Sequence, residues 1–99
     1  MPSEKITPAI ASDLANLFEA LSDPTRVRII SALIEGEIGV GELVESIGPT
    51  KSAVSHQLRG LRDKRIIRTR KQGRNVFVCI DDDHVIELFQ RGLDHVLHG

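Results

Sequence analysis

Four side chains that often bind metal ions lie in two pairs near the C-terminal end of the sequence. Asp82 and His84 form a D-x-H pair, and His95 and His98 form an H-x-x-H pair. Three neutral imidazoles and one carboxylate suit tetrahedral zinc or cobalt(II), and four protein ligands leave no open position for a catalytic water. The pairs therefore predict a regulatory or structural metal site and not the centre of a zinc hydrolase.

The two pairs are too far apart to bind one ion within a single helix. His84 and His95 are separated by eleven residues, which is about 16 Å along a helix axis, whereas Zn–N bonds are only about 2.0 to 2.1 Å long. If two copies of the helix pack antiparallel across a twofold axis near Phe89 and Gln90, the first pair of one copy faces the second pair of the other. We therefore expect a homodimer with two equivalent intersubunit sites for zinc or cobalt.

A helix that carries these pairs is predicted from the residues around them. Asp81, Asp82 and Asp83 supply a cap and negative charge for its start. Its apolar side chains recur at helical spacing and are Val85, Ile86, Leu88, Phe89, Leu93, Val96 and Leu97. A stripe of this width is typical of a dimerisation helix.

Two further helices are predicted before Gly36. Thr7-Pro8 and Asp23-Pro24 each combine an N-cap residue with proline at the first helical position. The first helix ends near Ser22 and has apolar residues at Ile10, Leu14, Leu17, Phe18 and Leu21, and the second has them at Val27, Ile30, Leu33 and Ile34. Gly36 is a stop signal for the second helix.

The middle of the chain predicts two helices joined by a tight turn. The first is short, contains Leu43, Val44 and Ile47, and is closed by Gly48-Pro49. The second runs from its cap Thr50 to Lys64. Its buried positions are expected to be Val54, Leu58 and Leu61.

A β-hairpin follows these helices. Residues 66–70 and 75–80 are short runs rich in β-branched side chains, and residues 71–74 between them include a glycine. Four helices, a hairpin wing and a last helix make a mainly α fold of the winged helix-turn-helix class. We expect residues 1–99 to form one such domain, with its N- and C-terminal helices as dimerisation helices.

Positive charge is concentrated on the elements that would face DNA. Residues 51–74 hold nine of the thirteen lysines and arginines and one of the fourteen acidic residues, although the whole chain has a net charge of -1. This distribution favours double-stranded operator DNA as a partner over a merely solvated face. The candidate contacts are Lys51, Ser52, Ser55, His56 and Arg59 on the second helix of the turn, and Arg70, Lys71 and Arg74 on the wing.

Composition indicates an ordinary soluble protein. The chain has 40% hydrophobic and 27% charged residues, and no apolar run approaches the roughly 20 residues of a membrane helix. No secretory signal is visible at the start, and one cysteine cannot form an internal disulfide framework. We expect a cytoplasmic protein with no membrane association, no enzymatic activity and no small-molecule substrate.

The order of elements, the string of residues 52–61 (SAVSHQLRGL) and the two ligand pairs together resemble the ArsR/SmtB family of metal-responsive repressors. The resemblance spans nearly the whole chain. It is strongest to the zinc- and cobalt-responsive branch, in which a D-x-H and an H-x-x-H or H-x-x-E pair on the last helix bind metal across the dimer. It implies a repressor that leaves its operator when zinc or cobalt binds, so that genes for metal efflux or homeostasis are expressed.

Cysteine usage separates this chain from the arsenic, cadmium and lead sensors of the same family. Those sensors carry cysteines at the start of the third helix, where residues 37–43 contain none. Cys79 is expected in the second wing strand as an inert packed side chain. Three alternatives stay open: a nickel or cobalt sensor, a repressor that responds to oxidation of Cys79, and a zinc clamp that only holds the dimer.

Overall fold

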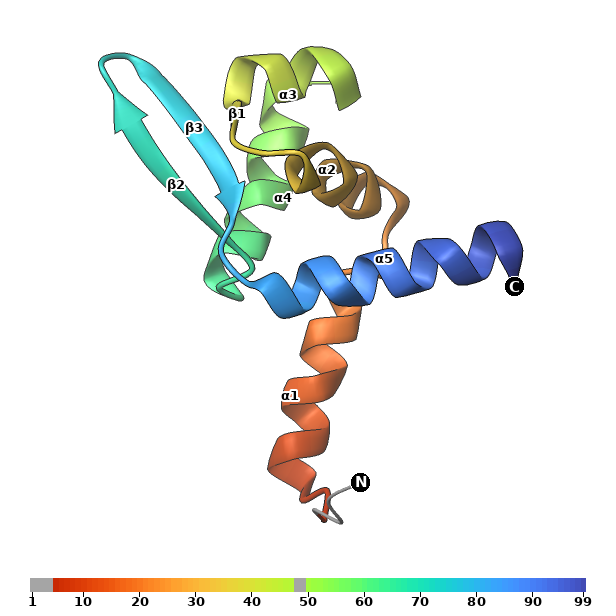
Figure 1. Cartoon of the computed structure of the whole chain (residues 1–99). Helices are drawn as coiled ribbons and strands as arrows, with labels where there is room; N and C mark the ends of the chain where they lie inside the picture. The colour runs from red at the N-terminus through yellow and green to blue at the C-terminus, as the bar shows by residue number, and fades with distance from the viewer. Residues whose placement is uncertain (1–4, 48–49) are drawn as a thin grey trace.

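The computed structural model describes residues 5–47 and 50–99 and has the expected winged helix-turn-helix fold (Figure 1). In chain order the elements are α1 (Pro8–Glu19), α2 (Pro24–Ile34), β1 (Ile38–Gly39), α3 (Val40–Ile47), α4 (Lys51–Asp63), β2 (Ile67–Gln72), β3 (Asn75–Ile80) and α5 (Asp83–His98). The five helices and the β2–β3 hairpin, which we call the wing, confirm the predicted order. The two-residue strand β1 was not predicted.

The predicted helix starts are confirmed by their caps. The side chains of Thr7, Asp23 and Thr50 each accept a hydrogen bond, at 3.0 to 3.1 Å, from the backbone N–H three residues further along. Such caps satisfy amide groups that a helix start leaves unpaired. α1 ends at Glu19, before the predicted Ser22. The predicted stop of the third helix at residues 48–49 lies outside the described part of the chain.

The sheet differs from the prediction in having a third strand and a shorter hairpin turn. β1 pairs antiparallel with β3, which gives the strand order β1-β3-β2. A two-residue strand is too short to show alternation in the sequence, and it forms only because β3 offers it partners. Gln72 pairs with Asn75, so the turn consists of Gly73 and Arg74 and not of the predicted residues 71–74. Gly73 has a φ of 63°, which glycine adopts without strain.

The core lies between α2, α3, α4, the start of α5 and one face of the sheet. The predicted buried residues Val54, Leu58 and Leu61 are all buried. On α2 the fully buried residues are Ile29 and Ile30, whereas the predicted Val27 is half-buried. The remaining buried side chains are Ala20, Leu33, Leu43, Ile66, Ile67, Val78 and Val85. This core sets the position of α4 and the wing relative to each other.

Two helices leave apolar side chains uncovered in the single chain. α1 extends away from the rest of the molecule, and α5 runs across the end of α1 that is nearer the other helices (Figure 1). The large exposed apolar side chains are Ile6, Ile10, Leu14 and Phe18 at α1 and Leu93, Val96 and Leu97 on α5. Among the described residues, no helix is both long and apolar enough to cross a membrane. These are the two helices that the sequence predicts to form the dimer.

Candidate functional site

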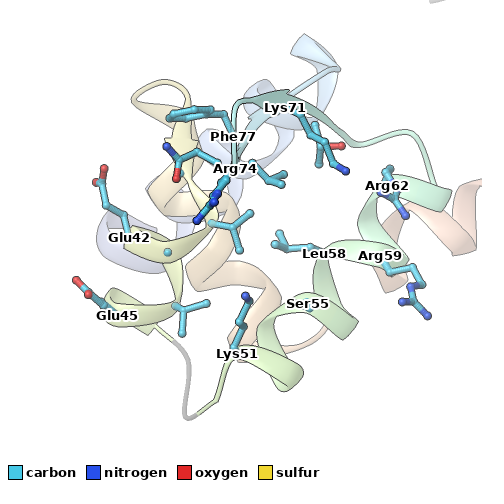
Figure 2. Close-up of a pocket in the computed structure, with 17 residues that line it drawn as sticks. Glu42, Glu45, Lys51, Ser55, Leu58, Arg59, Arg62, Lys71, Arg74 and Phe77 are labelled. Atoms are coloured by element: carbon cyan, nitrogen blue, oxygen red, sulfur yellow. The ribbon is translucent and has the colours of Figure 1, made fainter.

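A basic groove of about 890 Å³ lies between α4 and the wing (Figure 2). α4 contributes Lys51, Ser55, Arg59 and Arg62 to its lining, and the wing contributes Lys71 and Arg74. Glu42 and Glu45 of α3 line the opposite edge. In Figure 2 the α4 and wing cations lie on two sides of the space in front of Leu58. The groove therefore presents cations from two separate elements to a bound polyanion.

The α4 residues predicted to contact DNA are all exposed, and the groove has one further cation on this helix. Lys51, Ser55 and Arg59 line the groove, whereas Ser52 and His56 are exposed on α4 outside its lining. Arg62 also lines the groove, although the sequence reasoning did not select it. Positions 51, 55, 59 and 62 recur every three or four residues and so share one helix face, which is the signal that would have found Arg62.

The structure separates Arg70 from the other two wing residues predicted to contact DNA. Lys71 and Arg74 line the groove, but Arg70 lies on the other face of the sheet and forms an ion pair with Glu37. Successive side chains of a strand point to opposite faces, so Arg70 and Lys71 cannot both face the groove. Arg70 is therefore exposed but already engaged by another residue.

The first predicted ligand pair is close to a metal-binding arrangement. Asp82 is the N-cap of α5, and its Oδ1 accepts a hydrogen bond from the His84 backbone N–H at 2.9 Å. The same oxygen lies 3.0 Å from His84 Nδ1. Two ligand atoms of a tetrahedral zinc with bonds of about 2.0 to 2.2 Å are roughly 3.4 Å apart. Only a small opening of this pair would admit an ion.

The second predicted pair lies at the other end of the same helix. His95 and His98 are in the last turn of α5, and both are exposed. A spacing of three residues places them next to each other on one helix face. Within residues 5–47 and 50–99, no three His, Cys, Asp or Glu side chains gather into one metal-binding group. One chain therefore holds the four candidate ligands as two separate pairs, and their imidazole and carboxylate donors are of the types that bind zinc or cobalt.

Arg26 links the N-terminal helix α1 to α4, a contact that the periodicity of the sequence does not predict. It lies on α2, and its Nη2 donates to the Glu19 carbonyl oxygen at the end of α1, at 2.9 Å. Its Nη1 donates to Gln57 Oε1 on α4 at 3.3 Å. The Nε atom is buried and has no partner among the described residues. Through these bonds one guanidinium positions α4 against α1.

Arg26→Met is expected to lower the free energy of unfolding by about 1 to 3 kcal/mol, because two hydrogen bonds from a charged donor are lost while the apolar stem is retained. Arg28→Met is the matched control on the same helix, since Arg28 is exposed and makes a single bond of 3.4 Å to the Ser46 carbonyl oxygen. Urea unfolding at one fixed protein concentration measures both. Equal losses in the two variants would show that Arg26 has no special linking role.

Cys79 lies in the second wing strand, as predicted, and is half-buried. Arg68 Nε donates to its Sγ at 3.2 Å, and Arg68 Nη1 forms an ion pair with Asp81 at 3.2 Å. The hydrogen bond to Cys79 is the main reason that the pKa of Arg68 is raised above its ordinary value, and the neighbouring Asp81 carboxylate adds to it. Cys79 is thus held on the sheet face opposite the groove.

Comparison with known structures supports the fold over almost the whole chain. The structure of the AntR antimony-specific transcriptional repressor superposes with a TM-score of 0.86 and 34% sequence identity, and it covers 97% of this chain and 87% of that one. The shared fold includes the elements that form the groove and the helix that carries the ligand pairs. The groove and the two candidate ligand pairs therefore lie within a framework that a known repressor also has.

Sequence comparison identifies the family. Residues 23–69 match the sequence model of the arsR family of bacterial regulatory proteins. A transcriptional repressor SmtB homolog of Synechocystis is 43% identical over 86 residues, which are 87% of this chain and 65% of that protein. The regulator NmtR of Mycobacterium tuberculosis is 35% identical over 98% of this chain and 81% of its own length. These relatives are regulators by name, which confirms the prediction that the chain is not an enzyme. The chain belongs to the arsR family of bacterial regulatory proteins.

Proposed function

We propose that this protein is a homodimeric transcriptional repressor that binds operator DNA when metal-free and releases it when zinc, or cobalt, binds between the two α5 helices. The observation that carries the proposal is the placement of two incomplete ligand pairs at opposite ends of one helix. Release would allow expression of genes for metal efflux or homeostasis. Because its operator is chromosomal or plasmid DNA, the protein would act in the cytoplasm.

The exposed apolar side chains support the dimer. Leu93, Val96 and Leu97 are exposed and lie around His95 and His98 on the last turns of α5. Covering one large apolar side chain contributes about 1.5 to 3 kcal/mol. Antiparallel packing of two α5 helices would cover these side chains and bring the second ligand pair of one protomer to the first pair of the other. The same contact therefore serves dimer stability and metal binding.

The number and types of the ligands favour zinc or cobalt over soft ions and over octahedral nickel. Asp82, His84, His95 and His98 offer imidazole nitrogens and carboxylate oxygen, which suit tetrahedral zinc. The similarity to an antimony-specific repressor does not extend to its ion, because soft ions select thiolates and this chain has one cysteine. Nickel would want six ligands in an octahedron, and the two pairs supply four.

DNA binding is assigned to the groove and the exposed side of α4. Five cations of the groove, three on α4 and two on the wing, would neutralise DNA phosphates. They are Lys51, Arg59, Arg62, Lys71 and Arg74. Ser52, Ser55 and His56 are exposed on α4, where hydroxyl and imidazole groups can meet base edges in the major groove. A twofold dimer would read a near-palindrome whose half-sites are separated by about one helical turn or a multiple.

The proposal is tested by titrating a bound operator with metal. A duplex is first selected from a random library by the metal-free protein, and binding is then followed by fluorescence anisotropy with zinc, cobalt or nickel. Zinc and cobalt are expected to weaken binding by at least about fivefold, with a smaller effect of nickel. If zinc strengthens binding, the repressor-release mechanism is wrong. Dissociation of the dimer on metal removal would support the clamp alternative instead.

Cys79→Ser protein serves as the control in the same titration. It should release DNA with zinc as the wild type does, because the thiol is on the sheet face opposite the groove and outside both ligand pairs. If the wild type instead released DNA with hydrogen peroxide but not with zinc, and Cys79→Ser did not respond to peroxide, the alternative in which oxidation of Cys79 is the signal would be favoured.

A further inference from the structure

All three nitrogens of the Arg70 guanidinium donate to neighbouring side chains. Its Nε donates to Glu37 Oε2 at 2.8 Å and its Nη2 donates to Glu37 Oε1 at 2.6 Å, which is a bidentate ion pair. Its Nη1 donates to Gln72 Oε1 at 3.0 Å. Three of its N–H groups are therefore in use before any DNA is present.

Phe77 completes this arrangement from the central strand. Arg70 Cζ lies 4.6 Å from the centroid of the Phe77 ring, and Arg70 and Phe77 are direct partners in the β2–β3 register. Phe77 is also the register partner of Gly39 on β1. A methyl group on Gly39 would lie 3.7 Å from the ring. The ring thus contacts the Arg70 guanidinium from β2 and lies next to Gly39 of β1.

The charges of Arg70 and Glu37 neutralise each other within the ion pair. The hydrogen bond from Arg70 holds the pKa of Glu37 below its ordinary value, and the same bond raises the pKa of Arg70. Both groups are therefore charged at neutral pH, and their charges cancel at short range. The groove cations Lys71 and Arg74 have no such partner among the described residues. Arg70 consequently adds little to the field that attracts phosphates.

The ion pair joins the wing to the start of the helix-turn-helix. Glu37 immediately precedes β1, and β1 leads directly into α3 at Val40. Arg70 is on β2, the strand at the far side of the sheet. We propose that Glu37 and Arg70 form a wing clamp that fixes the angle of the hairpin against α3 and α4, so that Arg70 is a positioning residue for DNA binding and not a DNA contact. This inference rests on the proposed function.

Glu37→Gln tests the wing clamp by the sign of its effect. If only net charge mattered, removing a carboxylate near the DNA-binding face would strengthen operator binding. If the wing clamp positions the hairpin, binding should weaken by about two- to fivefold, the range expected for loss of one well-formed exposed ion pair. Glu35→Gln is the matched control, because Glu35 is exposed nearby and forms no ion pair with any residue that the structure describes. It should leave binding unchanged or slightly stronger.

Arg70→Gln tests the same idea through the salt dependence of binding. The wing clamp predicts the same loss as Glu37→Gln, no further loss in the double variant, and an unchanged slope of log affinity against log salt. A phosphate contact would instead reduce the slope by about 0.9 per site. Lys71→Gln, which removes a groove cation, should show that reduced slope. The paired exchange Glu37→Arg with Arg70→Glu should recover most of the lost affinity.

Different results would contradict the wing clamp and the proposed function. A reduced slope for Arg70→Gln, or stronger operator binding by Glu37→Gln, would overturn the wing clamp while leaving wild-type DNA binding and zinc release intact. Zinc affinity, which depends on α5, should be equal in all these variants and so reports that each one is folded. A wild-type protein that binds no DNA would instead contradict the proposed function itself.

Discussion

Proteins with His95→Ala or Asp82→Ala are expected to bind the operator as tightly as the wild type without metal and to stay bound when zinc is added. Each substitution removes one of the four proposed ligands, one at each end of α5. Neither residue lines the groove between α4 and the wing. Loss of zinc response without loss of DNA affinity is therefore the predicted result.

The physical reason is that the proposed ligands and the proposed DNA contacts lie on different elements. Zinc can act on DNA binding only through the way in which the two protomers are held, by favouring a dimer whose half-site spacing does not match DNA. The coupling free energy should be at least about 1 to 3 kcal/mol, or about 5- to 150-fold in operator affinity. Coupling is reciprocal, so DNA should weaken zinc binding to the wild type by the same factor.

His56→Ala is the matched control for this experiment. It also removes an exposed imidazole, but from α4 and outside both ligand pairs. Calorimetric titration should give it wild-type zinc affinity, while His95→Ala loses most of its affinity. If His95→Ala lost operator affinity in the absence of metal, or if His56→Ala lost zinc binding, the assignment of ligands and contacts would be wrong.

Operator affinity is expected to fall by about a thousandfold or more between roughly 50 and 200 mM salt. This fall is typical of proteins that neutralise about 6 to 10 phosphates and release their counterions. Each protomer places five cations along the groove, which are Lys51, Arg59, Arg62, Lys71 and Arg74. Two protomers on a palindrome would reach the upper part of that range.

Single substitutions measure how much each basic residue contributes to the salt dependence of operator affinity. Arg59→Gln should reduce the slope of log affinity against log salt by about 0.9 for each protomer that binds DNA. Arg91→Gln removes an exposed arginine of α5 outside the groove and should leave the slope unchanged. A flat response of the wild type to salt would argue against a groove that binds phosphates.

Features that depend on neighbouring residues were predictable from the sequence. The caps Thr7, Asp23 and Thr50 bond to amides three residues away, so each helix start is specified locally. The inward positions of α4 followed from helical spacing, and the pair of Asp82 and His84 is close in space because it is close in sequence. The family pattern also rests on such local strings.

Only the tertiary structure decided how distant residues meet. Arg26 bonds to Gln57 over 31 residues, and Arg70 bonds to Glu37 over 33. β1 forms only against β3, and this pairing brings Glu37 within reach of Arg70 and away from the groove. The sequence marks Arg70 as basic and near a turn, but the face on which it lies depends on the register of a sheet that packing completes. Local hydrogen bonds and periodicity determined the elements, whereas burial of the common core determined which side chains of those elements are free to bind DNA.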